Sequence, residues 1–242
     1  MKLFVNGCSF SAGHDDVHTE SGKLAPPSDY VWANTIKNNF DDVTNLSVAG
    51  SSNDRIVRTT LDYFEHNSSQ DIIAVIQWTS PFRFEQYVPT FKNWIQFCNI
   101  TDPQGCSIHC DDGKVLEKIL KSKWSGYFQS IVKDQIEITR SVNDYVIKYI
   151  KNILVLECFL NLKGIPYVFT SMSSNTHVPL MSESTDFEQN LMSQTDFSKW
   201  TSKPLSSYAG KNVISATDTH PNQQGHADIG KMLLNKIQEI SK

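Results

Sequence analysis

The sequence predicts a single α/β domain that is built around a mostly parallel β-sheet. The chain has 242 residues, which is the size of one large domain. Short apolar runs of β character alternate with segments of helical periodicity, and this alternation is typical of βαβ units. No internal repeat or low-complexity tract divides the chain. We therefore expect one domain over residues 1–242.

Five segments are predicted to be strands of the sheet. The clearest is Asp71–Gln77, whose run Ile72-Ile73-Ala74-Val75-Ile76 is typical of a strand buried on both faces. The other four are, in chain order, Lys2–Asn6, Val43–Val48, Ile165–Thr170 and, as the weakest, Asn212–Ser215.

Four helices are predicted from capping residues and apolar spacing. Ser28 can cap a helix through Phe40, and Ser52 or Asn53 can cap another through about His66. The longest helical pattern runs from about Ser130 to Lys163, followed by Gly164 and Pro166, which end it. The last helix runs from about Asn222 to Ile240.

Two stretches, 81–129 and 171–211, interrupt the alternation and are predicted to be loop or helical insertions. Both follow predicted strand ends, so a parallel sheet places them at its carboxyl edge, where open α/β folds bind ligands. We expect these insertions to form walls or lids of a pocket.

Composition excludes several classes of function. Lys and Arg number 22 against 26 Asp and Glu, a net charge of −4, and no basic run is present, which disfavours nucleic-acid binding. No apolar stretch approaches the ~18 residues of a membrane span, and no signal peptide is expected, so the prediction is a cytoplasmic protein.

The five cysteines are an odd number and widely scattered, which indicates reduced thiols. Cys106 and Cys110 flank His109, but a zinc site needs a second close pair of ligands, and none follows. We expect no metal and no other cofactor.

Two motifs at opposite ends of the chain carry candidate chemistry. The first predicted strand leads into Gly7-Cys8-Ser9, where Ser9 presents a hydroxyl near backbone N–H groups; the alternative is a polar turn. Asp218-Thr219-His220 precedes the last helix, so His220 can act as a general base that Asp218 orients; the alternative is simple helix capping.

Together these motifs resemble the SGNH (GDSL-like) hydrolases. Their first block, Gly-Asp-Ser-x-Ser/Thr-x-Gly, matches Gly7-Cys8-Ser9-Phe10-Ser11-Ala12-Gly13 except at Cys8. Residues 45–53 are similar to the second block and nominate Gly50 as an oxyanion donor, and residues 220–225 are similar to the last block, with its His-Pro pair and following Gly. The resemblance implies a three-layer α/β/α sandwich with a central five-stranded, mostly parallel sheet, as in flavodoxin-like folds.

The chain departs from the family pattern in two places. The third block normally supplies an Asn side chain to the oxyanion, whereas here Thr79 holds that position, with Ser80 beside it. The family acid usually stands three residues before the histidine, where this chain has Thr217, while Asp218 stands two before. Either Asp218 reaches the imidazole, or a Ser-His dyad operates with a backbone carbonyl that orients His220.

The resemblance implies a serine esterase that cleaves a small O-acyl ester, with O-acetylated carbohydrate favoured over lipid. Ser9 is the expected nucleophile and His220 the base, while the N–H groups of Ser9 and Gly50 and the hydroxyl of Thr79 hold the oxyanion. The alternatives are an O-acyltransferase and a catalytically impaired module that binds a glycan or a protein.

Three residues near the end of the third predicted strand are candidates for substrate binding: Trp78, Ser80 and Arg83. Trp78 is equally consistent with a core or rim aromatic. For Arg83 the favoured alternative is a surface ion pair with Glu85.

Overall fold

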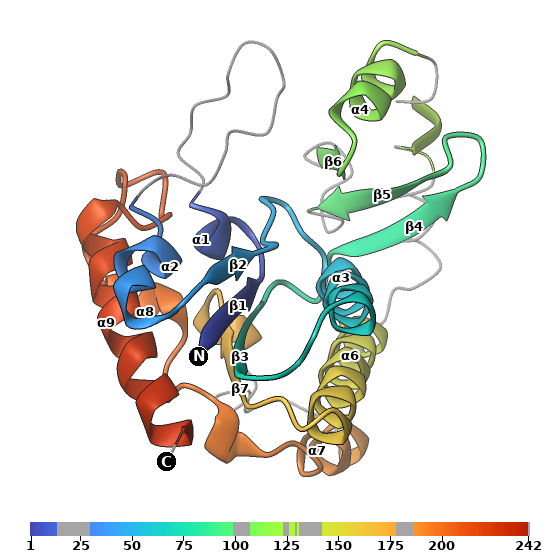
Figure 1. The fold of residues 1–242 in the computed structure, drawn as a ribbon. Coiled ribbons are helices and arrows are strands. Elements are labelled where there is room, and N and C mark those ends of the chain that lie inside the picture. The colour runs from blue at the N-terminus through green and yellow to red at the C-terminus, as the bar shows by residue number, and fades with distance from the viewer. Residues whose placement is uncertain are drawn as a thin grey trace.

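The computed structural model describes residues 1–13, 30–98, 107–122, 126–128, 130, 142–177 and 186–241. Its central sheet has four parallel strands in the order β2-β1-β3-β7 (Figure 1). They are β1 (Lys2–Asn6), β2 (Val43–Asn45), β3 (Ile72–Trp78) and β7 (Tyr167–Ser171). The first four predicted strands are therefore confirmed.

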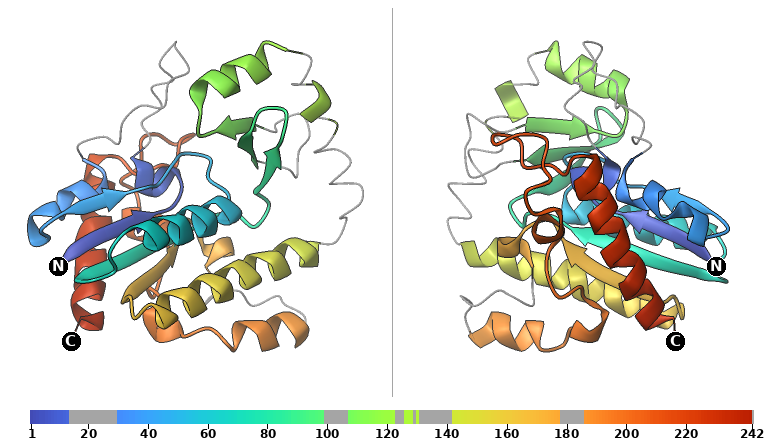
Figure 2. Two further views of the ribbon diagram at one scale, coloured as in Figure 1. Left: turned by 45° about the vertical axis from the view of Figure 1, so that its right-hand side comes forward. Right: turned by 90° about the vertical axis from the view of Figure 1, so that its left-hand side faces the viewer.

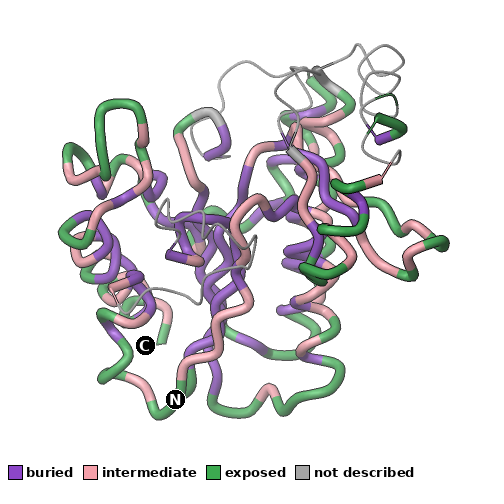
Figure 3. The backbone as a smooth tube through the Cα atoms, turned by 90° about the horizontal axis from the view of Figure 1, so that it is seen from above, coloured by how far each residue is buried: buried purple, intermediate pink, exposed green. Residues whose placement is uncertain are grey.

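Helices cover both faces of this sheet, as the sequence predicts (Figures 1 and 2). Alternate residues of β1 point to opposite faces: Phe4 packs in the core cluster beneath two helices, α3 (Asn53–His66) and α6 (Val142–Leu162). Leu3 packs in the cluster beneath α9 (Gln223–Ile240). Figure 3 shows the strands as a buried centre between partly exposed helices, and the molecule is therefore a three-layer α/β/α sandwich.

Smaller helices complete the two outer layers. Their bounds are α1 (Ser9–Ala12), α2 (Trp32–Thr35), α7 (Asp186–Met192), α8 (Leu205–Ala209) and the 3-10 turns η1 (Lys37–Asn39), η2 (Ser174–Thr176) and η4 (Phe197–Lys199).

The helix ends agree with the predicted caps in two of the four helices. Ser52 caps α3, because its Oγ accepts a hydrogen bond from the N–H of Arg55 at 3.2 Å. Asn222 caps α9 in the same way, with 3.0 Å between its Oδ1 and the N–H of Gly225.

The helix predicted between Ser28 and Phe40 is shorter than expected. Residues 28 and 29 lie outside the described residues, and the remainder forms only α2 and the turn η1. The Thr35 hydroxyl and the Asn39 amide donate to the carbonyls of Trp32 and Ile36, and such local side-chain bonds compete with a continuous helix. For the helix predicted from Ser130 to Lys163, α6 is described over Val142–Leu162, and residues 131–141 lie outside the described part.

The fifth predicted strand, Asn212–Ser215, was wrong. Val213 makes only an isolated antiparallel bridge with Pro221. The segment has two apolar residues among polar ones, and the side chain of Ile214 is not buried. Its backbone pairs with its own continuation instead: the N–H of Ile214 donates to the carbonyl of His220 at 2.9 Å. The main sheet therefore has four strands, and the segment supports the turn that carries His220.

The stretch 81–129 contains a second sheet that the sequence reading did not predict. β4 (Phe84–Val88), β5 (Asn93–Cys98) and β6 (Ser107–Cys110) pair antiparallel in that order, followed by α4 (Gly113–Leu120). This sheet lies beyond the carboxyl ends of the parallel strands, on the side of α1 (Figures 1 and 2). It has its own apolar cluster around Ile95 and Phe97.

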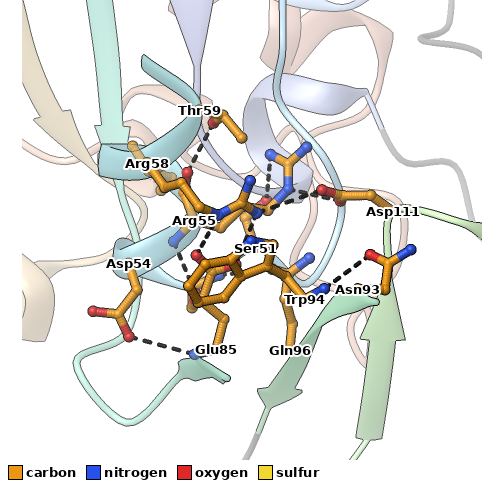
Figure 4. Close-up of polar contacts among 12 residues, drawn as sticks. Ser51, Asp54, Arg55, Arg58, Thr59, Glu85, Asn93, Trp94, Gln96 and Asp111 are labelled. Atoms are coloured by element: carbon orange, nitrogen blue, oxygen red, sulfur yellow. Dashed lines mark hydrogen bonds and ion pairs between the residues drawn. The ribbon is translucent and has the colours of Figure 1, made fainter. Parts of the chain in front are cut away.

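Ion pairs attach this insertion to α3, as Figure 4 shows. Arg58 makes two hydrogen bonds to Glu85, at 2.8 and 3.0 Å, and its guanidinium lies 4.9 Å from the ring centroid of Trp94. Arg55 pairs with Asp111 at 2.8 Å between Nε and Oδ1. Because the side chains of Arg55 and Glu85 are almost fully buried, loss of either partner leaves an uncompensated charge and destabilises the contact.

Among the described helices, none is long and apolar enough to cross a membrane.

Candidate active site

The strand order places three loops side by side at one edge of the sheet. β1 lies between β2 and β3, so the segments that follow these three strands meet at their carboxyl ends. Ser9 follows β1, Gly50 follows β2 and Thr79 follows β3. The chain connects β1 to neighbours on opposite sides, which makes this edge the switch point at which open α/β sheets bind ligands.

Ser9 stands at the start of the single turn α1, directly after β1. The turn ends at Gly13, whose φ of 71° is the left-handed conformation that favours glycine. Asn6 holds the turn from behind, because its Oδ1 accepts from the N–H of Gly7 and its Nδ2 donates to the carbonyl of Ile56 in α3. The position of Ser9 is therefore set by the sheet and by α3 together.

A chain of hydrogen bonds joins the three residues nominated as nucleophile, base and acid. The distance from His220 Nε2 to Ser9 Oγ is 2.8 Å, and that from His220 Nδ1 to Asp218 Oδ1 is 2.6 Å. The same carboxylate oxygen accepts from the backbone N–H of His220 at 3.0 Å. Asp218 thus reaches the imidazole from two residues away, because the tight turn folds its side chain back over the ring.

The surroundings of His220 fix the plane of its ring. The ring of Phe10 lies 5.2 Å from it, centroid to centroid. Behind the turn, Gly225 lets α9 approach the chain closely, since a Cβ there would stand 2.2 Å from the carbonyl oxygen of Asn212. The side chain of His220 keeps 31% of its surface exposed, so the imidazole is both held and accessible.

The backbone N–H groups of Ser9 and Gly50 have no hydrogen-bond partner among the described residues. The loop that carries Gly50 is tied to the turn that carries Ser9, because the N–H of Val48 donates to the carbonyl of Gly7 at 3.2 Å. Asn45 adds a second tie through its side-chain amide, 2.8 Å from the carbonyl oxygen of Ser11. Unpaired N–H groups near a nucleophile are what an oxyanion requires.

Thr79 is fully buried, and its hydroxyl meets the geometric criteria for a hydrogen bond with no described residue, although it lies close enough to the Cys8 thiol to help lower that thiol's pKa. Its backbone is fixed by Asn53, whose side-chain oxygen accepts from the N–H of Thr79 at 2.9 Å and whose amide donates to its carbonyl at 3.1 Å. The same amide also reaches the carbonyl of Ser80. Asn53, at the start of α3, therefore holds the corner at which the family pattern has its third block.

Cys8, which replaces the family aspartate, is buried against Gln77. The N–H of Cys8 donates to the Gln77 side-chain oxygen at 3.1 Å, and the Gln77 amide donates to the Cys8 sulfur at 3.0 Å. Burial raises the pKa of the Cys8 thiol, but the positive charge of Arg83 and the hydrogen bond from Gln77 together lower it below its ordinary value. Cys8 is inaccessible, so we assign it no nucleophilic role.

The three candidate substrate-binding residues have different surroundings. The side chain of Trp78 is completely buried in the core against Tyr149 and Phe169, so the structure does not bring it to the site surface. Ser80 accepts the N–H of Phe82 at 3.2 Å and supports the turn before β4. Arg83 is half-buried and lies over the Gly50 loop, where its Nη1 is 3.4 Å from the carbonyl oxygen of Ser51.

The ion pair expected between Arg83 and Glu85 is absent from the described residues. Glu85 bonds instead to Arg58, from the neighbouring helix α3. Glu85 lies in β4 and its side chain faces α3, whereas Arg83 precedes that strand. The two side chains therefore have different neighbours.

The sequence reading missed three residues that shape the site: Asn53, Gln77 and His109. The sequence predicts Asn53 only as a helix cap and Gln77 only as part of a strand. Both are polar residues at the boundary of a buried element, which is the signal that could have identified them. The ring of His109, on β6, packs so closely on Gly50 that a Cβ there would meet its Cδ2 at 2.7 Å.

No group of three possible metal ligands occurs within the described ranges. His109 and Cys110 lie on β6, and Cys106 lies outside the described residues. A second histidine near the site, His226 on α9, is buried, and burial lowers its pKa to about 4. His226 is therefore neutral at physiological pH.

A cavity of about 680 Å³ lies elsewhere, between α8, α9 and the segment after β7. Its lining includes Trp200, Tyr208 and Met232 and none of Ser9, Asp218 and His220. This cavity is separate from the candidate active site.

Comparisons with known proteins give a clear result only at the level of structure. No protein-family model matches the chain, and no curated protein matches it either. Among solved structures, a G-D-S-L family lipolytic protein from Desulfitobacterium hafniense aligns over 97% of this chain and 98% of its own, with TM-score 0.51 and 8% identity.

A structure of the psychrotrophic esterase EstA from Pseudoalteromonas sp., in which the enzyme is inhibited by monoethylphosphonate, aligns over 98% of this chain and 97% of its own. Its TM-score is 0.50 and its identity 12%. Such low identities establish the fold alone. The fold of this chain is therefore that of the SGNH hydrolases.

Proposed function

We propose that this protein is a serine esterase that acts through an acyl-enzyme. The observation that carries the proposal is the continuous hydrogen-bonded chain from Ser9 Oγ through His220 to Asp218. A serine hydroxyl bonded to an imidazole, which is bonded in turn to a carboxylate, is the arrangement that activates a serine for acyl transfer.

The first half-reaction forms an ester on the enzyme. Ser9 Oγ attacks the acyl carbonyl carbon as its proton passes to His220 Nε2, while the Asp218 carboxylate accepts a hydrogen bond from Nδ1–H and stabilises the imidazolium. The carbonyl oxygen becomes negative and is held by the N–H groups of Ser9 and Gly50, with the Thr79 hydroxyl as a third donor. When the C–O bond breaks, the leaving alkoxide takes the proton from His220 Nε2.

The second half-reaction releases the acid. A water molecule gives a proton to His220 Nε2 and attacks the acyl carbon, and the proton then returns to Ser9 Oγ as the C–O bond to the serine breaks. An alcohol acceptor in place of water gives an O-acyltransferase, so transfer and hydrolysis share the same residues.

For the substrate, we propose a small O-acyl ester and favour an O-acetylated carbohydrate over a lipid. The support is the polar character of the segments around the site, which are rich in Ser, Thr and Asn.

A phosphonate probe tests the nucleophile directly. We expect a fluorophosphonate to label the wild type covalently and to leave Ser9→Ala unlabelled, while the matched control Ser68→Ala, at an exposed site, is labelled as the wild type. Mass spectrometry locates the adduct, and hydrolysis of 4-nitrophenyl acetate should fall with the labelling.

Absence of labelling in a folded wild type would overturn the proposal and favour a binding module of the same fold. Product analysis with an added alcohol then separates hydrolysis from acyl transfer, because a transferase forms the new ester in preference to the free acid.

A further inference from the structure

Arg83 is an arginine at the candidate active site that no described carboxylate neutralises. It lies between the end of β3 and the start of β4, and its Nη1 contacts the carbonyl of Ser51, the neighbour of Gly50. That contact, at 3.4 Å, is long and engages one of the five N–H donors of a guanidinium.

The two arginines of α3, unlike Arg83, are both paired with carboxylates. Arg55 pairs with Asp111, and Arg58 pairs with both Glu85 and Asp111 (Figure 4). The described residues thus contain enough carboxylates on this side to pair two guanidinium groups, and these are used on α3. Arg83, in the same part of the chain, forms no ion pair with any residue that the structure describes.

One donor of Arg83 is also buried without an acceptor. Its Nε is inaccessible and forms no hydrogen bond with any described residue. A cationic donor that has lost water and gained no acceptor costs free energy, and an oxyanion that binds the remaining N–H groups of the same guanidinium offsets that cost with a charge-assisted bond. The fork of a guanidinium fits a carboxylate in two-point contact.

The charge of Arg83 reaches the nucleophile turn. It lowers the pKa of the Cys8 thiol against the opposing effect of burial. The sulfur of Cys8 is 3.9 Å from Ser9 Oγ. The guanidinium therefore contributes positive potential beside the serine.

We propose that Arg83 is a specificity-determining residue that binds a carboxylate or another oxyanion group of the substrate. The preferred ester is then one of an acidic molecule, such as an O-acylated acidic sugar, rather than a neutral one. This inference rests on the proposed esterase function. It assigns to Arg83 a contact with a charged group of the substrate and no part in holding the reacting carbonyl.

Two pairs of esters test the proposal. In one pair the carboxylate is in the alcohol part (4-acetoxybenzoate against its methyl ester), and in the other it is in the acyl part (4-nitrophenyl hemisuccinate against 4-nitrophenyl butyrate). Arg83→Gln should reduce kcat/KM for the charged member of at least one pair by about tenfold or more relative to its neutral member, mainly through KM. Arg83→Lys should restore part of the preference.

The matched control removes the same charge elsewhere. Lys37→Gln, at an exposed residue of η1, should leave the ratio of charged to neutral ester unchanged. Equal losses for both members of both pairs would overturn the proposal and assign Arg83 to the oxyanion or to the fold. Unchanged kcat/KM for all four esters would overturn it as well.

A direct binding measurement separates this inference from the esterase proposal. Calorimetry with benzoate should give binding to the wild type that Arg83→Gln loses, whether or not Ser9 reacts. If the fluorophosphonate fails to label the wild type but benzoate binds through Arg83, the esterase proposal fails and the anion site stands. If Ser9 is labelled and no carboxylate binds, the anion site fails alone.

Discussion

The central sheet and the β4–β6 insertion hold the Gly50 loop from two sides and by different means. On the sheet side the contacts are local to the strand ends, such as the bond from the N–H of Val48 to the carbonyl of Gly7. On the insertion side the contacts are made by side chains: Gln96 accepts the N–H of Ser52, Cys98 donates to the carbonyl of Gly50, and the ring of His109 packs on Gly50.

This difference separates two tasks within one site. Strand order and backbone pairing place Ser9, Gly50 and the corner at Thr79 together, and they do so whatever side chains cover the edge. The insertion covers the loop and supplies none of the three residues of the hydrogen-bonded chain, but the segment that enters it carries Arg83. We infer that the sheet sets the reaction and the insertion sets which ester is taken.

The change with the largest expected effect acts on the hydrogen-bonded chain and leaves the insertion unchanged. Asp218→Asn removes the charge that stabilises the imidazolium and favours the wrong tautomer, so kcat should fall on the order of 10³-fold or more with little loss of stability. Steady-state kinetics and thermal unfolding measure both. The control is Thr217→Ala, at the position where the family usually has its acid, which should change kcat little.

An unchanged rate in Asp218→Asn would show that a backbone carbonyl orients His220 instead, and the site would then be a dyad.

A smaller effect is expected where the two regions meet. Gly50 has a φ of 78°, and an added Cβ would press on the His109 ring, whereas Gly164 has a φ of 65° and open space around it. Gly164→Ala therefore reports conformational strain alone, about 1–2 kcal/mol. Gly50→Ala should lose more stability than that and should also lower kcat, as measured by thermal unfolding and hydrolysis.

The same comparison in a His109→Ala background tests whether the His109 ring causes the extra loss of stability in Gly50→Ala. Removal of the ring should reduce the excess cost of Gly50→Ala toward the cost seen at Gly164. Equal losses at the two glycines in the wild-type background would contradict close packing of the insertion on the loop.

The smallest expected effect concerns the hydroxyl of Thr79. Thr79→Val should lower kcat about tenfold with little change in KM if that hydroxyl joins the oxyanion donors, whereas Thr79→Ser should keep most of the rate. A buried hydroxyl without a partner destabilises the folded state. A valine variant that is more stable and equally active would thus remove Thr79 from the site.

The sandwich was predictable because its strands and long helices depend on periodicity. The apolar run before Gln77 and the stripe of α9 are local patterns, and the tertiary structure agrees with them. The second sheet was not predictable in this way: β4 reads Phe-Glu-Gln-Tyr-Val and β5 Asn-Trp-Ile-Gln-Phe-Cys, which alternate only in part. Their partners are each other and α3, and such pairing is not visible in a single short segment.

The same limit applies to the site. Ser9 and His220 could be nominated from short motifs, because each motif is continuous in the sequence. The expected pairing of Arg83 with Glu85 was wrong because neighbours in sequence were taken as neighbours in space, and the Arg58 that takes Glu85 lies 27 residues away. Asn53 holds Thr79 across 26 residues, a contact that no local pattern indicates.

Ser9 and His220 stand 211 positions apart and yet share a proton in the proposed reaction. A ribosome makes the serine long before the histidine, which follows the whole sheet and the insertion in the sequence. Under the proposed mechanism, an unfinished or truncated polypeptide that ends before residue 220 has no base for its serine and hydrolyses nothing. Catalysis would then begin only when the two distant motifs have met, so activity reports that synthesis has passed residue 220.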